Sequence, residues 1–165
     1  MSPEGYRHVT LIGDRMSIIK WDENLNIGVE RIDTQHRQLI NTINELHLAV
    51  QYGTAGDAIV PLIARLRDYA KAHFLSEELL FADLGYPGSV EHIQEHSNFI
   101  AQIEGLARQF SYNKDFMAVH IKDMLLTWFY HHIRTKDMEY KELLGSPNCH
   151  RTGALGLEGW TGRRL

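Results

Sequence analysis

Residues 73–80 read HFLSEELL, a stretch that combines apolar side chains with an imidazole and carboxylates. If it is helical, His73 and Glu77 are four residues apart and lie on the same face. That face also carries Tyr69 and Leu80, which are residues that pack in a core. A helix that directs an imidazole and a carboxylate into apolar surroundings must supply partners for both, because a buried polar group without one is costly.

Four segments of the chain show apolar side chains at three- and four-residue spacing, which is typical of amphipathic helices. Capping residues, glycines and prolines separate them, and no alternation typical of a β-strand has a useful length. The expected helices span about 33–52, 57–84, 89–110 and 115–144. Because the connections are short, neighbouring helices must be antiparallel, and we expect an all-α, up-down-up-down four-helix bundle.

Side chains that can cap helices set the expected helix starts. Asp33 or Thr34 is expected to cap the first helix, Asp57 the second and Ser89 the third. Pro61 then falls in the first turn of the second helix or close to it, where a missing N–H is tolerated.

The length and composition favour a single domain. With 165 residues, of which 44% are hydrophobic, the chain can bury a core of ordinary size. We expect residues 1–20 to form an N-terminal extension, or arm, and residues 21–145 to form the bundle. Residues 146–165 have little periodicity, so we expect a loosely packed or disordered tail.

Charge and cysteine content exclude several kinds of partner and site. A net charge of −4 argues against nucleic acid or an anionic membrane as the main partner, since both bind basic surfaces. Cys149 is the single cysteine, so neither an internal disulfide nor a cysteine-based metal site is expected. The sequence shows no signal peptide and no apolar run near the ~18 residues of a membrane span, so we expect a cytoplasmic protein.

Metal-binding side chains interrupt the apolar face of every predicted helix. The first and fourth helices each place one histidine there, and the second and third each carry a pair at four-residue spacing. An aspartate follows five residues after the histidine of the fourth helix. The full set is His36, His73, Glu77, His92, His96, His132 and Asp137.

Each of these residues alone is weak evidence for a metal site, because a histidine on an apolar face is usually a core residue with a hydrogen-bond partner. Their convergence changes the balance, since each unpaired polar group in the core would cost roughly 1–3 kcal/mol. Two metal cations would stabilise the whole set. The other histidines are expected to bind no metal: His8, His47, His120, His131 and His150. His131 lies about 100° round the helix from its neighbour and should face a groove or solvent.

The donor set narrows the choice of metal. Imidazoles and carboxylates without thiolate suit iron, manganese, zinc, nickel or copper. The number of protein ligands exceeds what one ion needs, so we expect two ions with bridging carboxylates. Imidazole-rich donors around a shared bridge suit iron, although raw affinity would favour copper or zinc.

Four stretches contain these residues: GVERIDTQH (28–36), HFLSEE (73–78), HIQEH (92–96) and WFYHHIRTKD (128–137). In this combination and order they resemble the hemerythrin family in its bacterial form, from about residue 21 to residue 144. The resemblance implies a non-heme di-iron centre that binds dioxygen reversibly.

The resemblance also implies a role for each ligand. One iron has three histidine ligands: His92, His96 and His132. The other has two: His36 and His73. The carboxylates of Glu77 and Asp137 bridge both irons, together with an oxo or hydroxo group. The two-histidine iron is then one ligand short, and dioxygen binds at that open position.

Apolar side chains near the site must exclude water if binding is to be reversible. The expected walls of the oxygen pocket are Leu39, Ile40, Phe74, Trp128 and Phe129. Each of these residues also fits an ordinary place in the core.

Three functions are considered. The leading one is reversible dioxygen binding for storage, delivery or supply to a partner enzyme, without catalysis. The alternatives are an oxygen or redox sensor that acts through a separate partner, and a di-iron peroxidase or oxidase. The expected protein partner is an oxygen-using enzyme or a reductase. We expect the protein to be a monomer.

The spacing of His132 and Asp137 needs an explanation. Five residues place two side chains about 140° apart on an ideal α-helix, which is too far for a shared site. A π-bulge would bring them onto one face. Alternatively, the aspartate approaches the metals from the flank, and we expect this second arrangement because π-bulges are rare.

Overall fold

A computed structural model describes residues 17–108 and 114–145. Its long elements are α1 (Glu30–Gln51), α2 (Ala55–Leu84), α3 (Ser89–Arg108), α4 (Lys114–Trp128), the π-helix η2 (Phe129–Lys136) and α5 (Asp137–Leu144). A short 3-10 helix, η1 (Glu23–Leu25), precedes them, and the described ranges contain no strand. The predicted tail, and most of the predicted N-terminal extension, lie outside these ranges.

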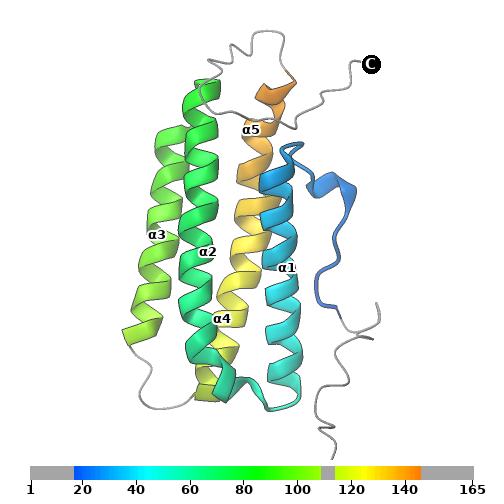
Figure 1. The fold of residues 1–165 in the computed structure, drawn as a ribbon, viewed down its shortest axis with the longest axis vertical. Helices are drawn as coiled ribbons and strands as arrows, with labels where there is room; N and C mark the ends of the chain where they lie inside the picture. Colours follow the sequence, from blue (N-terminus) through cyan, green and yellow to red (C-terminus); the bar gives the residue numbers. More distant parts are fainter. Residues whose placement is uncertain (1–16, 109–113, 146–165) are drawn as a thin grey trace, which may run out of the picture.

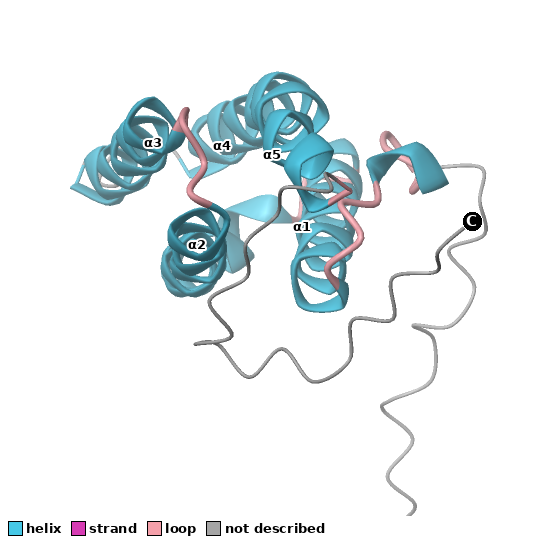
Figure 2. Ribbon diagram, turned by 90° about the horizontal axis from the view of Figure 1, so that it is seen from above, coloured by secondary structure: helices cyan, strands magenta, loops and turns pink. Residues whose placement is uncertain are grey.

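The helices form an antiparallel bundle. In Figure 1, α1, α2, α3 and the continuous column from α4 to α5 run alternately in opposite directions. Figure 2 shows the same columns end on. Helix α2 packs against α1, α3 and α4, and α1 also packs against α4. The predicted all-α, up-down-up-down bundle is confirmed. Among the helices described, none has the length and apolar composition that a membrane span requires.

Helices α1 and α2 begin earlier in the chain than the start positions predicted from the capping residues. Helix α1 begins at Glu30, and the carboxylate of Asp33 instead accepts hydrogen bonds from the backbone N–H groups of Ile27 and Gly28, at 2.6 and 3.0 Å. Asp33 therefore fixes the turn that leads into the helix, where Gly28 has a φ of 95°.

Helix α2 begins at Ala55, two residues before Asp57, so Pro61 lies inside the helix instead of in its first turn. Ser89 is itself the first residue of α3. At the other end of α2, Gly85 adopts a left-handed conformation with a φ of 61°, and this residue ends the helix as its position in the sequence suggests.

The core has two apolar parts with a polar layer between them. The smaller part lies where α1 begins and where α2 and α5 end, and it includes Ile32, Phe81 and Tyr140. The larger part fills the rest of the bundle. Along α1 and α2, His36 and Glu77 fall between residues of the two parts. The fold therefore places the polar side chains in a layer closed by apolar packing on both sides.

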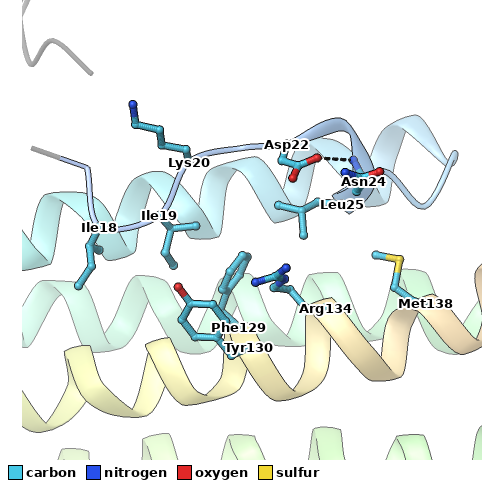
Figure 3. Close-up of a pocket in the computed structure, with 10 residues that line it drawn as sticks. All are labelled: Ile18, Ile19, Lys20, Asp22, Asn24, Leu25, Phe129, Tyr130, Arg134 and Met138. Carbon is cyan, nitrogen blue, oxygen red and sulfur yellow. Dashed lines mark hydrogen bonds between the residues drawn. The ribbon is translucent and has the colours of Figure 1, made fainter. Parts of the chain in front are cut away.

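The residues before α1 pack along the bundle. The side-chain amide of Asn44 accepts hydrogen bonds from the N–H groups of Ile18 and Ile19, both at 3.0 Å, and donates to the carbonyl of Ile19 at 2.8 Å. Ile19 is buried in the larger part of the core. Figure 3 shows this segment lying over Phe129 and Tyr130, above a pocket of about 250 Å³.

Candidate metal centre

The bundle brings together all the side chains that the sequence singled out as metal ligands. They come from α1, α2, α3, η2 and the first residue of α5. Each has a relative exposure of 2% or less: His36, His73, Glu77, His92, His96, His132 and Asp137.

The donor atoms form two adjacent groups, in each of which all atoms lie within 4.8 Å of one another. One group contains three histidines and a carboxylate: His92, His96, His132 and Glu77. The other contains two histidines and two carboxylates: His36, His73, Glu77 and Asp137. The geometry thus separates three histidines from two, with Glu77 common to both groups.

Both carboxylates span the two groups. Oε2 of Glu77 lies 3.2 Å from Nε2 of His96 and 3.5 Å from Nε2 of His73. Oδ1 of Asp137 lies 3.1 Å from Nε2 of His92, and Oδ2 lies 3.2 Å from Nε2 of His36. Each carboxylate therefore contacts a histidine on both sides, as a bridging ligand would.

The donor set fits metal ions better than a hydrogen-bond network. Nε2 of His132 lies 2.9 Å from Nε2 of His92 and 3.2 Å from Nε2 of His96. Donor atoms about 3 Å apart are expected for neighbouring ligands of one ion with bonds of about 2.1 Å. Nε2 of His73, Oε2 of Glu77 and both oxygens of Asp137 are buried without a hydrogen-bond partner in the described part of the chain. A cation would stabilise these atoms, which make no hydrogen bonds to their present neighbours.

Burial and neighbouring charges hold His73 and Asp137 in the forms that bind cations, whereas His36 must give up a proton to bind one. Burial lowers the pKa of His73 to about 4, so this imidazole is neutral at neutral pH. Burial also opposes protonation of His36, but the adjacent charge of Asp137 outweighs it and raises the pKa of His36. Burial would raise the pKa of Asp137, but the surrounding imidazoles, chiefly His132, lower it, and this carboxylate stays ionised. Neutral imidazole and ionised carboxylate are the metal-binding forms.

A π-helix places Asp137 beside His132. The backbone N–H of Asp137 donates to the carbonyl of His132, which is the five-residue hydrogen bond of a π-helix. The flanking approach that we expected is therefore wrong. Each backbone hydrogen bond of η2 spans one residue more than in an α-helix, so residues at five-residue spacing lie on nearly the same face.

Three residues that contact the histidines were not anticipated from the sequence. Nδ1 of His73 lies 3.1 Å from Oε1 of Gln35, and Nδ1 of His96 lies 3.1 Å from Oε1 of Glu78. Nδ1 of His132 lies 2.9 Å from Oε2 of Glu95. Each pair is oriented so that Nδ1–H donates and Nε2 is left to face the other ligands.

These three residues share a simple sequence signal. Gln35, Glu78 and Glu95 are each the immediate neighbour of a predicted ligand in the chain. Each contacts a histidine on the next column of the bundle, where α4, η2 and α5 count as one column. A polar residue next to a predicted ligand in the chain could therefore have been predicted to contact a histidine of a neighbouring helix.

Comparison with known proteins agrees with this geometry. Residues 27–144 match the model of a family described as hemerythrin HHE cation binding domain. The chain belongs to the hemerythrin family.

Individual hemerythrin-family relatives cover most of the chain. A bacteriohemerythrin of Stenotrophomonas maltophilia is 32% identical in an alignment of 155 residues that covers 91% of this chain and 97% of the relative. A bacteriohemerythrin of Clostridium acetobutylicum is 32% identical over 73% of this chain and 96% of its own length. Hemerythrin subunit 2 of Golfingia vulgaris is 31% identical over 73% of this chain and 89% of its own length.

Aromatic rings cover the three-histidine side of the hemerythrin-family site. Phe74 stacks on His96 with ring centroids 3.9 Å apart, and Trp128 stacks on His132 at 3.8 Å. Phe74 also lies 5.6 Å from the ring of His73. Among the residues expected to wall an oxygen pocket, Trp128 is partly exposed, and the others are buried: Leu39, Ile40, Phe74 and Phe129. That they wall an oxygen pocket stays a prediction.

The histidines that were expected to bind no metal lie outside both donor groups where they are described. His131 is exposed, as predicted, and it lines a groove on the surface. His120 is also exposed, and His47 is partly buried. His8 and His150 lie outside the described residues.

Proposed function

We propose that this protein binds dioxygen reversibly at a di-iron centre, for storage, delivery or supply to another protein. The observation that carries the proposal is the pair of adjacent, buried donor groups, one with three histidines and one with two, joined by two carboxylates. Relatives named bacteriohemerythrin and hemerythrin subunit 2 support it.

Two iron ions in these groups would supply the electrons that dioxygen binding needs and recover them on release. In our proposal, the first is held by His92, His96 and His132, and the second by His36 and His73. Glu77 and Asp137 would contact both.

The number of protein donors makes the two sides different. Both carboxylates contact histidines of both groups, so they do not distinguish the two sides. The histidines do, because the side of His36 and His73 has two imidazoles and the other side has three. An ion on that side would therefore have one protein ligand fewer and could take an external ligand instead. His36 and His73 would orient the site without filling it.

The chain also controls the surroundings of the site. The excess of neutral imidazoles over carboxylates limits the negative charge around the metals, which disfavours higher oxidation states. Leu39, Ile40 and Phe129 are buried in the apolar core next to the site along the sequence, and they help to exclude water. A site that is dry and rich in neutral donors favours reversible binding over turnover.

Repeated binding and release of oxygen by the iron-loaded protein tests the proposal. The protein is loaded with ferrous iron without air, exposed to oxygen and then flushed with inert gas, while the visible absorbance is followed. We expect an absorption band that appears with oxygen and disappears on flushing over several cycles. Steady consumption of hydrogen peroxide with an added reductant, without reversible oxygen uptake, would instead indicate a peroxidase.

A pair of variants tests the roles of the two sides. His36→Ala should impair oxygen binding more than it impairs loading of the three-histidine side. His120→Ala, which changes an exposed histidine outside both donor groups, is the matched control and should behave as wild type. Normal oxygen binding by His36→Ala would show that the open side is assigned wrongly.

A further inference from the structure

The contacts to Nδ1 of the histidines form an ordered series around the bundle. Gln35 of α1 contacts His73 of α2, and Glu78 of α2 contacts His96 of α3. Glu95 of α3 then contacts His132 of η2. Helices α1, α2 and α3 therefore each supply one polar residue that contacts Nδ1 of a histidine on the next column of the bundle.

The side chains that contact Nδ1 of the histidines differ in charge between the two donor groups. Two histidines of the three-histidine group, His96 and His132, face carboxylates. In the two-histidine group, His73 faces the neutral amide of Gln35. Each group also has one histidine, His36 or His92, whose Nδ1 is buried without a hydrogen-bond partner within the described residues. All of the negative charge in this outer layer of Nδ1 partners thus lies on one side.

The orientation of Gln35 is fixed by its own contacts. Its side-chain nitrogen donates to the hydroxyl of Ser76 at 3.5 Å, and its backbone carbonyl accepts from the hydroxyl of Tyr69 at 2.6 Å. The amide oxygen is therefore the atom left to face His73. The acceptor that His73 meets on this side is therefore neutral.

An acceptor on Nδ1–H makes the opposite nitrogen a stronger ligand, and a carboxylate does so more than an amide. We propose that Glu78 and Glu95 are positioning residues that make the two halves of the centre electrostatically unequal. The three-histidine half then binds its ion more tightly and favours the higher ionic charge. This inference rests on the proposed di-iron site.

Solvent exposure limits the size of the effect. The side chains of Glu78 and Glu95 are 33% and 26% exposed. Glu95 also lines an open groove of about 450 Å³ between α3 and α4, together with Trp128 and His131. Water therefore screens part of their charge, and we expect losses near the lower end of the ~10–100-fold range that outer partners of metal ligands show.

Glutamine substitutions separate charge from hydrogen bonding. Glu78→Gln and Glu95→Gln each keep an oxygen that can accept from Nδ1–H but remove the negative charge. Gln35→Glu is the reciprocal change, because it adds a carboxylate on the two-histidine side. Glu45→Gln, at an exposed position of α1, is the control for overall charge.

The first measurement is a titration with Fe²⁺ without air, against a coloured chelator, which gives two dissociation constants. In the variant with both glutamates replaced, we expect the tighter constant to weaken about 10-fold and the weaker one to change much less. Gln35→Glu should bring the two constants closer together by tightening the weaker one. Glu45→Gln should match wild type.

A second measurement excludes a merely structural role. The potential at which the iron-loaded protein is half reduced should rise in the doubly substituted variant. Two negative charges that stabilise the ferric form are then missing. Unchanged constants and potential in a variant that still loads two irons would overturn the inference, and so would equal weakening of both constants. If wild type itself does not load two irons, the proposed function fails, and this inference fails with it.

Discussion

The hydroxyl of Tyr140 lies 2.6 Å from Oε1 of Glu77, and both side chains are completely buried. Burial and the nearby charges of Glu77 and Asp137 raise the pKa of Tyr140 well above its usual value, so the hydroxyl stays protonated and donates. One oxygen of Glu77 is therefore occupied by Tyr140. The other, Oε2, is the oxygen that faces His73 and His96.

Tyr140→Phe should destabilise the protein and loosen the centre. The substitution leaves Oε1 of Glu77 buried without a donor, and such a loss costs about 1–3 kcal/mol in the free energy of unfolding. Unfolding in guanidinium chloride measures the cost. Tyr130→Phe is the control, since Tyr130 is 49% exposed. Equal midpoints and slopes for Tyr140→Phe and wild type would show that the contact contributes nothing.

Metal binding and folding should be coupled. If the buried donors hold two irons, free iron at about 100 times its dissociation constant should add ~2.7 kcal/mol to the stability of the folded chain. His73→Ala should lose much of the bound iron and of this gain, whereas His120→Ala, at an exposed position, should keep both. Iron analysis and thermal melts, with and without iron, check this. Wild type that melts at one temperature regardless of iron would contradict it.

Much of the fold could be predicted because helix spacing is a local property. The apolar residues at three- and four-residue spacing predicted the four columns, and nearly all those described are buried or partly buried, as Ile43, Ile59, Ile103 and Ile121 show. Except for Asp137, the side chains of the two donor groups could be found in the same way, because each occupies a position where the spacing calls for an apolar residue.

What the sequence did not show depends on contacts between helices. Asp33 could cap a helix, but whether it does so depends on where the preceding segment lies, and here it binds Ile27 and Gly28. Tyr140 has the pattern of an ordinary core residue, and only the packing of α5 against α2 brings its hydroxyl to Glu77. Local propensity contains no information about such partners.

The segment before α1 should depend on Asn44. Its amide makes three hydrogen bonds to the backbone of Ile18 and Ile19, and Ile19 is 5% exposed. Asn44→Ala should therefore speed hydrogen exchange at the amides of both residues and lower the free energy of unfolding by about 1–3 kcal/mol. Iron binding should not change, since Asn44 is in neither donor group. Asn98→Ala, on the exposed surface of α3, is the control, and unchanged exchange in Asn44→Ala would contradict the prediction.

Asp137 should tolerate no change in side-chain length. The π-helical hydrogen bond from its N–H to the carbonyl of His132 fixes the backbone, and the side chain is completely buried. Its two oxygens reach opposite sides of the centre, at 3.1 Å from Nε2 of His92 and 3.2 Å from Nε2 of His36.

Asp137→Glu adds one methylene without adding space, so the carboxylate must rotate or push the histidines apart, and overpacking of this kind costs about 1–3 kcal/mol. We expect the variant to fold, to load less than two irons and to lose reversible oxygen binding. Glu139→Asp, a change of the same size at an exposed position two residues further on, should keep both properties. If Asp137→Glu loaded two irons and bound oxygen as wild type does, the π-helix would not set the geometry of the bridge, and the five-residue spacing would need another explanation.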